Sequence, residues 1–253
     1  MKIGVVIPAL DEESAIPLVL NDLPRDLLHE IIVVDNGSAD ATAERAREGG
    51  AKVVDEPRRG YGSACLRGIA SLDPQVELVV FLDADHSDHA EELREVVAPI
   101  LAGDADLVIG SRTLGTAARG ALLPQARFGN RLACFLIRVL FGHRYTDLGP
   151  FRAIGRDALS RIGMRDPDFG WTVEMQVKAL QCGLRVAEVP VSYRRREGVS
   201  KITGTVRGTV AAGTKILWTI FRYGILQRAW GGSLRRTGSG AEPARRKQGP
   251  TDA

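Results

Sequence analysis

The sequence has few cysteines and no long apolar run, and its first residues do not have the pattern of a signal peptide; each shortage argues against a class of protein. The three cysteines, Cys65, Cys134 and Cys182, lie far apart without CxxC spacing, which predicts small buried side chains in a reducing compartment rather than a disulfide framework. No stretch reaches the roughly 18 uninterrupted apolar residues of a membrane-spanning helix. The first run, KIGVVIPAL, lacks the basic segment and cleavage site of a signal peptide, so we expect a cytoplasmic protein.

The charge of the chain is unevenly distributed. A chain of 253 residues can bury one sizeable core, and we expect one α/β domain with appendages. Between Arg194 and Trp230 there are eight lysines and arginines against one glutamate, and after Trp230 five against two, although the net charge is only +3. An acidic body with a basic end predicts an anionic partner there, such as a diphosphate, a lipid phosphate or a membrane surface. No nucleic-acid module pattern is present, so nucleic acid is not expected as a partner.

Short apolar runs alternate with helix-like segments up to Ser111. The runs are continuous rather than alternating in polarity, as in strands that are covered on both faces. A strand followed by a helix, repeated, predicts βαβ units and a mostly parallel sheet flanked by helices. In such sheets ligands bind at the carboxyl ends of the strands. The expected strands are IGVVIPAL, EIIVVDN, AKVVDE, ELVVFLDAD and DLVIGS, and Asp11, Asp35, Asp83 and Asp85 stand at or just after strand ends.

The pattern is less regular after Ser111. The sequence predicts a helix over PQARFGNRLACFLIRVLFG, then a loop, strand and helix over TDLGPFRAIGRDAL, and a further helix over GWTVEMQVKALQCG. The run VAEVPVSYRRR predicts an edge strand, because Pro190 cannot donate to a sheet ladder.

The C-terminal end predicts two segments distinct from the body. Residues 205–226 have an apolar and a basic face, which predicts an amphipathic helix with Trp218 and Tyr223 as aromatic anchors at a membrane surface. The alternative is a helix docked on the body. The last 23 residues are rich in glycine, proline and charge, which predicts disorder. The expected division is therefore 1–204, 205–230 and 231–253.

The stretch VVFLDADHSD ends an apolar run with two carboxylates separated by one alanine. Isolated buried charge is costly, so Asp83 and Asp85 need either solvent or a cation. Both side chains project to one side of the strand and can share a hard divalent ion, Mg²⁺ or Mn²⁺, with nucleotide phosphates supplying further oxygen ligands. The simpler alternative is a strand that ends in a solvated loop.

Three further segments contain residues suited to a nucleotide. In VVDNGSADAT, Asp35 follows a strand and can accept hydrogen bonds from a base or ribose, and the alternative for this loop is a simple helix cap. In EPRRGYGSACLRGI, two arginines precede Gly60 and Gly62, which predicts a loop at a helix start that binds a phosphate or a nucleotide. In RRREGVSK, residues 194–201, a basic loop can close over a diphosphate, and the alternative is a solvated charge run.

In this order and near these spacings, IPALDEE, VVDNGSADAT, RRGYGSA and FLDADHSD resemble a family 2 glycosyltransferase. The later blocks RFGNRLACFL, TDLGPFRAI, GWTVEMQVKAL and RREGVSK resemble its dolichyl- or polyprenyl-phosphate sugar synthase branch. The resemblance covers most of residues 3–201 and implies a Rossmann-like fold of the GT-A type. The chain differs from the pattern at Asn36, where many members have aspartate, and at Ser87, where the branch often has glutamine.

The resemblance also implies roles for individual positions. It implies a metal at Asp83 and Asp85, and an acidic residue of the acceptor-side helix at Glu174. The segments implied to hold the nucleotide sugar contribute Pro8, Ala9, Asp11, Glu12, Asp35, Asn36, Gly60, Asp83, Ala84, Arg195 and Ser200. The residues implied to act on the diphosphate or the acceptor are Asp85, Arg112, Arg127, Arg131, Arg152, Glu174 and Lys201.

The implied reaction is metal-dependent, inverting transfer of a hexose from a UDP- or GDP-linked sugar. If the acceptor is a polyprenyl phosphate, its phosphate is already ionised near neutral pH and needs no strong base. If the acceptor is a sugar hydroxyl, a base is needed and Glu174 is expected to supply it. A non-catalytic protein that binds sugar nucleotides is a further alternative. A lipid acceptor implies peripheral attachment to the inner face of the cell membrane.

Overall fold

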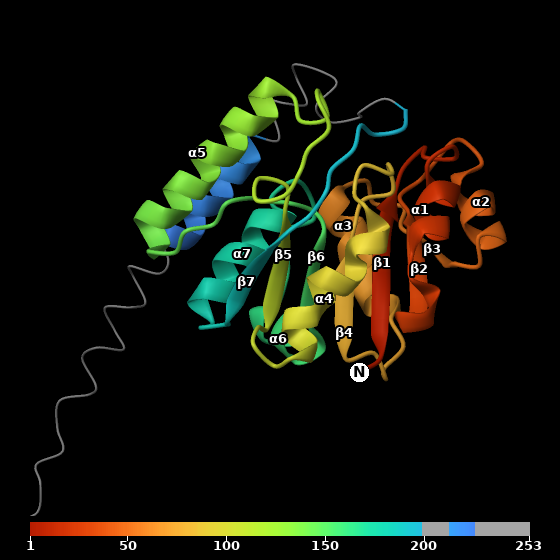
Figure 1. Ribbon diagram of the computed structural model, residues 1–253, viewed down its shortest axis with the longest axis horizontal. Helices are drawn as coiled ribbons and strands as arrows, with labels where there is room; N and C mark the ends of the chain where they lie inside the picture. The colour runs from red at the N-terminus through yellow and green to blue at the C-terminus, as the bar shows by residue number, and fades with distance from the viewer. Residues whose placement is uncertain (199–212, 226–253) are drawn as a thin grey trace, which may run out of the picture.

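The protein forms a seven-stranded sheet covered by helices on both faces (Figure 1). The computed structural model describes residues 1–198 and 213–225. Predictions for Ser200, Lys201, the rest of the C-terminal helix and the tail lie outside these residues and stay predictions. The strands are β1 (Ile3–Ala9), β2 (Leu28–Asp35), β3 (Lys52–Asp55), β4 (Leu78–Phe81), β5 (Leu107–Ser111), β6 (Arg152–Gly155) and β7 (Val186–Pro190).

The strand order is β3-β2-β1-β4-β6-β5-β7. Strand β6 runs antiparallel to β4 and β5, and the other pairs are parallel. The expected mostly parallel sheet is therefore confirmed, and β7 lies at its edge as Pro190 predicts. Because β1, β2 and β4 are parallel neighbours, their carboxyl ends meet at one edge of the sheet.

The helices divide between the two faces of the sheet. Helices α3, α5, α6 and α7 pack on one face, and α1, α2 and α4 pack on the other. Along β1, Val6 points to the first face while Val5 and Ile7 point to the second, and all three are fully buried. The helices are α1 (Ile16–Asp22), η1 (Arg25–Leu27), α2 (Thr42–Glu48), α3 (Tyr61–Ser71), η2 (Ala90–Glu92), α4 (Leu93–Leu101), α5 (Pro124–Phe141), α6 (Arg156–Ile162) and α7 (Trp171–Gln181).

A further helix, described over residues 213–225, lies beside α5 and is drawn in blue in Figure 1. Ile220 is fully buried in the same hydrophobic cluster as α5 and α7, and Gly224 approaches Leu140 of α5. Tyr223, expected at a membrane surface, instead turns inward and donates a hydrogen bond to Glu174 over 2.7 Å. This helix therefore docks on the body through one face.

The opposite face of the same helix is exposed. Trp218 is 63% exposed and Ile225 66%, and Phe221 lies between them. Amphipathic character was expected here, and the structure shows which residues form each face. None of the helices in the described ranges is long and apolar enough to span a bilayer.

Candidate active site

A cavity of about 450 Å³ opens at the carboxyl ends of β1, β2 and β4. We call it the carboxylate cavity, because Glu12, Asp83 and Asp85 lie in its wall. It gathers residues from the first, second and fourth strands with others from much later in the chain. Its lining residues are Pro8, Ala9, Leu10, Glu12, Asn36, Arg59, Gly60, Tyr61, Ala64, Asp83, Ala84, Asp85, Asp168, Phe169 and Arg196.

The two aspartates after β4 are held in different ways. Asp85 is buried, and its Oδ1 accepts hydrogen bonds from the backbone N–H and the hydroxyl of Ser87. Asp83 Oδ1 accepts a hydrogen bond from the hydroxyl of Tyr61 over 3.0 Å. Burial, and next the charge of Asp85, raise the pKa of Asp83 to about 7. Burial also raises the pKa of Asp88 well above its usual range.

These carboxylates fit a divalent cation. Asp83 and Asp85 stand two residues apart in the cavity wall, and carboxylate oxygens are the ligands that Mg²⁺ and Mn²⁺ prefer. Among the described residues, no group of three or more histidine, cysteine, aspartate or glutamate side chains is arranged to hold a metal. Asp83 and Asp85 would therefore hold the ion as a pair and leave the rest of its ligand shell to phosphate and water.

Asp11 and Asp35 brace the loops at the strand ends and do not line the cavity. Asp11 Oδ1 accepts a hydrogen bond from the N–H of Ala39, and Asp35 Oδ1 accepts one from the N–H of Ser38. Asp11 also has a positive φ of 50°, which is uncommon for a residue other than glycine. The Asp11 bond holds the loop after β1 against the loop after β2, and the Asp35 bond closes a turn within the loop after β2. The nucleotide contacts predicted for the two aspartates stay predictions.

Asn36 lines the carboxylate cavity and organises its rim. Its Nδ2 donates to the carbonyls of Glu56 and Arg58 over 2.9 and 2.8 Å, and its Oδ1 accepts from the N–H of Gly60. An aspartate could not donate the first two bonds. The amide therefore has a specific use at this position, where the family pattern often has a carboxylate.

The glycines before and within α3 are explained by packing rather than by phosphate. A Cβ at Gly60 or Gly62 would overlap with the backbone of Pro167 or Asp166. The N–H of Ser63 in the first turn of α3 donates to the carbonyl of Pro167 over 2.8 Å. The prediction that this helix start holds phosphate is therefore not supported, although Gly60 and Arg59 do line the cavity.

The three arginines after β7 face three different partners. Arg196 reaches into the carboxylate cavity and pairs with Glu12 and Asp85. Arg194 pairs with Asp22 on α1. Arg195, the predicted nucleotide ligand, instead donates to the carbonyl of Arg119 and does not line either cavity described here.

Sequence reasoning missed six residues that line the carboxylate cavity, of which Leu10 and Ala64 have aliphatic side chains and the other four have aromatic or charged ones. Tyr61, Asp168, Phe169 and Arg196 come from segments whose side-chain directions depend on tertiary packing. Arg196 lies in the recognised basic run, but nothing in the run separates it from its neighbours. Asp168 and Phe169 immediately precede the GW block, and only the packing of residues 166–168 on α3 brings them to the cavity.

A second cavity, of about 300 Å³, lies between the loop after β5 and α5. We call it the arginine cavity. Arg127 and Arg131, one turn apart on α5, are exposed at its wall, and neither pairs with a carboxylate among the described residues. Its lining residues are Arg112, Thr113, Gly115, Ala117, Leu122, Ala126, Arg127, Asn130, Arg131 and Asp147.

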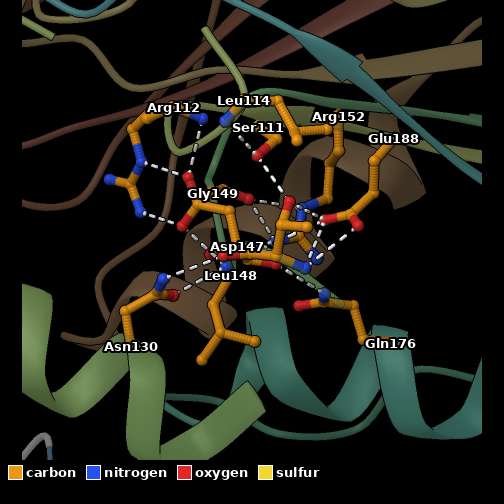
Figure 2. Close-up of polar contacts among 11 residues, drawn as sticks. Ser111, Arg112, Leu114, Asn130, Asp147, Leu148, Gly149, Arg152, Gln176 and Glu188 are labelled. Atoms are coloured by element: carbon orange, nitrogen blue, oxygen red, sulfur yellow. Dashed lines mark hydrogen bonds and ion pairs between the residues drawn. The ribbon is translucent and has the colours of Figure 1, made fainter. Parts of the chain in front are cut away.

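Arg112 is fixed at the base of the arginine cavity. Figure 2 shows its guanidinium beside Asp147, with Nε–Oδ2 and Nη2–Oδ1 distances of 2.8 Å each. Its guanidinium carbon lies 5.0 Å from the centre of the Tyr193 ring. Asp147 is buried and also accepts from the N–H of Leu148. This bidentate pair sets the position of Arg112 before any ligand binds.

Arg152 and Glu174 were predicted to act on the substrates, but neither lines a cavity described here. Arg152 is fully buried and donates to the carbonyl of Gly149 (Figure 2). It also donates to the carbonyl of Thr172 over 2.9 Å. It therefore holds the loop before β6 against the start of α7. The prediction that it lines the diphosphate or the acceptor phosphate is not supported by this placement.

Glu174 is a buried structural hub in α7. It accepts hydrogen bonds from the N–H groups of Arg165 and Asp166 and from the hydroxyl of Tyr223, and it pairs with Lys178 at 2.8 Å. Burial would raise its pKa, but the bonds from Lys178 and Tyr223 outweigh burial and lower the pKa below its usual value. The structure does not place it as a base facing an acceptor.

Comparison with known proteins gives the family of the chain. The model of the family Glycosyl transferase family 2 matches residues 4–163. An uncharacterized glycosyltransferase of Mycobacterium tuberculosis is 39% identical over 212 residues, which are 83% of this chain and 94% of that protein. A dolichyl-phosphate hexose transferase of Haloferax volcanii is 34% identical over 206 residues, 79% of this chain and 86% of its own.

A solved structure shares the fold. Glucosyl-3-phosphoglycerate synthase of Mycobacterium tuberculosis, in complex with Mn²⁺, uridine diphosphate and glucosyl-3-phosphoglycerate, matches with a TM-score of 0.72 and 25% identity, covering 88% of this chain and 79% of that chain. The expected GT-A fold is confirmed, as is the likeness to polyprenyl-phosphate sugar transferases. The strand order, the aspartate pair at the end of β4 and the sequence matches lead to one conclusion: the chain belongs to glycosyl transferase family 2.

Proposed function

We propose that this chain is a metal-dependent, inverting glycosyltransferase that moves a hexose from a UDP- or GDP-linked sugar to a polyprenyl phosphate. The observation that carries the proposal is the presence of two cavities of opposite charge. The carboxylate cavity suits a metal with a nucleoside diphosphate, and the arginine cavity suits a phosphate. The acceptors named for the two relatives, a dolichyl phosphate and a phosphoglycerate, both carry a phosphate.

The donor is held at the edge of the sheet. Pro8, Ala9 and Asn36 line the part of the cavity that would take the nucleoside, and Asp83 and Asp85 would hold the ion. A bound divalent cation supplies positive charge that stabilises the diphosphate as the glycosidic bond breaks. Arg196 is the cationic side chain that lies nearest to Asp85 among the ion pairs of the described residues.

The acceptor phosphate is oriented by arginines. A phosphate monoester has a second pKa near 6, so one oxygen is already a nucleophile at neutral pH. Arg127 and Arg131 have no carboxylate partner among the described residues and can bind two of the other phosphate oxygens. Arg112, paired with Asp147, lines the base of the same cavity. The reaction then needs no general base, which agrees with the structural role of Glu174.

The bond changes balance without a further reactant. A phosphate oxygen of the acceptor forms a bond to the anomeric carbon from the face opposite the leaving group. The bond between the anomeric carbon and the diphosphate oxygen breaks, and the nucleoside diphosphate leaves with the electron pair. Attack from the opposite face inverts the anomeric configuration.

An apolar surface beside the arginine cavity favours a lipid acceptor. Helix α5 carries Arg127 and Arg131 and also exposes Phe128 and Phe135, which are 70% and 59% exposed. The neighbouring helix exposes Trp218, Phe221 and Ile225. An acceptor with a phosphate head and an apolar tail matches this neighbourhood, and the same surface would rest on the cytoplasmic face of the membrane.

The transfer assay tests the reaction. Purified protein is incubated with UDP- and GDP-sugars, Mn²⁺ or Mg²⁺, and either a short polyprenyl phosphate or 3-phosphoglycerate. We expect transfer of sugar to the lipid phosphate, dependent on metal and lost in Asp85→Asn. Transfer to phosphoglycerate alone would replace the lipid by a soluble phosphate acceptor, which the solved relative favours. Nucleotide binding without any transfer would contradict catalysis.

A pair of variants on α5 tests the acceptor site. Arg131→Gln is expected to raise the KM for the acceptor roughly tenfold, because a charge-assisted hydrogen bond to phosphate is lost. Arg138→Gln removes the same charge from the same helix outside the cavity and is expected to leave that KM near wild type. Equal effects of the two variants would contradict an acceptor phosphate in the arginine cavity.

Vesicle flotation tests the membrane part separately. Binding to phosphatidylcholine vesicles that contain phosphatidylglycerol is expected to fall in a Phe135→Ser, Trp218→Ser double variant. Both side chains are exposed, so the melting temperature should stay near wild type. No binding by the wild-type protein would remove the membrane surface as a partner and leave the reaction itself untouched.

A further inference from the structure

The carboxylate cavity already contains a bound positive charge, that of Arg196. Its Nη2 lies 3.1 Å from Asp85 Oδ2 and 3.2 Å from Glu12 Oε1. Both carboxylates are more than nine-tenths buried. One guanidinium nitrogen therefore bridges the loop after β1 and the loop after β4, from a segment that follows β7.

The geometry of Asp85 makes this contact incompatible with a metal ion. Asp85 Oδ1 already accepts the backbone N–H and the hydroxyl of Ser87. Oδ2 is the oxygen that Arg196 contacts, and both residues line the cavity. A cation held by Oδ2 would face the guanidinium as a like charge at close range. Arg196 must leave Oδ2 for the metal to bind there.

Arg196 has one N–H donor, at Nε, that could bind a different partner if the guanidinium moved. Its Nε is buried and has no hydrogen-bond partner among the described residues. A buried donor without a partner is costly, so the guanidinium is not fully satisfied where it lies. The oxygens of a diphosphate would accept from a guanidinium in a bidentate arrangement.

We propose that Arg196 neutralises Glu12 and Asp85 before a metal binds and moves to the diphosphate when the metal and the nucleotide bind together. The inference rests on the proposed function, since it uses the same metal and nucleotide site. It predicts that each ligand alone binds weakly. The metal alone, for example, must displace Arg196 without giving the guanidinium a new partner. Together the ligands bind tightly, so Arg196 couples the two affinities.

Binding of Mn²⁺ measured by electron paramagnetic resonance tests this without turnover. In the wild-type protein we expect a saturating nucleoside diphosphate to tighten Mn²⁺ binding by roughly 10- to 100-fold. In Arg196→Gln we expect Mn²⁺ alone to bind several-fold more tightly than in wild type, and the effect of the nucleotide to shrink. Arg185→Gln removes the same charge from an exposed ion pair with Asp106, outside both cavities, and should bind Mn²⁺ like wild type.

A second variant covers the case in which Arg196→Gln folds poorly. Arg196→Lys keeps the positive charge but loses the fork of donors, so Mn²⁺ alone should still bind weakly while the nucleotide effect falls. Unchanged or weaker binding of Mn²⁺ alone in Arg196→Gln would overturn the inference. Absence of Mn²⁺ binding in every protein, with or without nucleotide, would overturn the metal part of the proposed function as well. Failure of the lipid acceptor in the transfer assay would leave the inference standing.

Discussion

At the scale of single residues, the chemistry of this chain depends on which side chains reach a cavity. Three consecutive arginines, Arg194 to Arg196, have the same charge and reach, yet one pairs with α1, one contacts a loop carbonyl and one enters the carboxylate cavity. Glu174 shows the opposite case, because a carboxylate expected to act as a base holds the molecule together instead.

Glu174→Gln is expected to destabilise the protein by about 2–4 kcal/mol at neutral pH, because the buried pair with Lys178 is broken. Since the folded-state pKa of Glu174 lies below its ordinary value of 4.5, the carboxylate stabilises the fold above that pH. The stabilisation is lost as the pH falls through the folded-state pKa. Melting temperatures of the two proteins should therefore differ at pH 7 and converge in acid. Lost activity with an unchanged melting temperature would instead indicate a catalytic base.

Asn36→Asp is expected to weaken nucleotide binding roughly tenfold. The new carboxylate cannot donate to the carbonyls of Glu56 and Arg58, and it would face them as an acceptor. Calorimetric titration with UDP and GDP measures the change. Asn21→Asp makes the same substitution at an exposed position of α1 and should bind like wild type. Equal affinities for wild type and Asn36→Asp would show that the rim does not depend on this amide.

At the scale of elements, the helix at residues 213–225 uses its two faces differently. Ile220→Ala is expected to cost about 2–4 kcal/mol, because Ile220 is fully buried against the core. Ile225→Ala, on the exposed side of the same helix, should leave the melting temperature within a degree or two of wild type. Vesicle binding should fall in Ile225→Ala and stay near wild type in Ile220→Ala. If both variants melt like wild type, the helix does not contribute to the core.

The contact between α3 and residues 166–168 can be tested with glycines. Gly62→Ala is expected to displace this loop from α3 and to reduce both stability and nucleotide affinity, because the new Cβ would overlap with the Asp166 carbonyl. Gly129→Ala in α5 has open space around the new Cβ and should stabilise the protein by about 0.5–1 kcal/mol. Thermal unfolding of both variants checks the pair. Tolerance of Gly62→Ala would show that the loop is free to move.

At the scale of the whole molecule, one segment connects the two cavities. The backbone of Tyr193 forms bridges with Asp88, which lies close in sequence to Asp83 and Asp85, and with Ala117, in the wall of the arginine cavity. Its ring lies under Arg112. The two cavities, built from segments far apart in the sequence, are thereby held in one arrangement.

Tyr193→Leu is expected to raise the KM for the donor and for the acceptor together, by roughly 3- to 10-fold each. The substitution removes the ring that supports Arg112, and it loosens the segment that leads to Arg196. Steady-state kinetics with each substrate varied in turn provides the measurement. A change confined to one substrate would show that the two cavities act independently.

The sequence by itself determined the sheet and the place of the site. Continuous apolar runs and the alternation of strands and helices depend on local patterning, and parallel strands carry their ligands at the carboxyl ends. That was enough to predict the strands, the helices α5 and α7, the edge strand β7 and the position of Asp83 and Asp85. The resemblance to the family, rather than local patterning, implied Pro8, Ala9, Glu12 and Asn36 beside them, all of which line the carboxylate cavity.

Only the tertiary structure decided which side chains face the ligands and which support the fold. Glu174 is buried because Tyr223, far along the chain, donates to it, and Gly62 is required because a loop from residues 166–168 lies against α3. Arg196 enters the cavity because Glu12 and Asp85, from the ends of two different strands, attract it there. Such contacts join segments that are distant in sequence. Periodicity and spacing do not encode them, since they arise only when the elements pack.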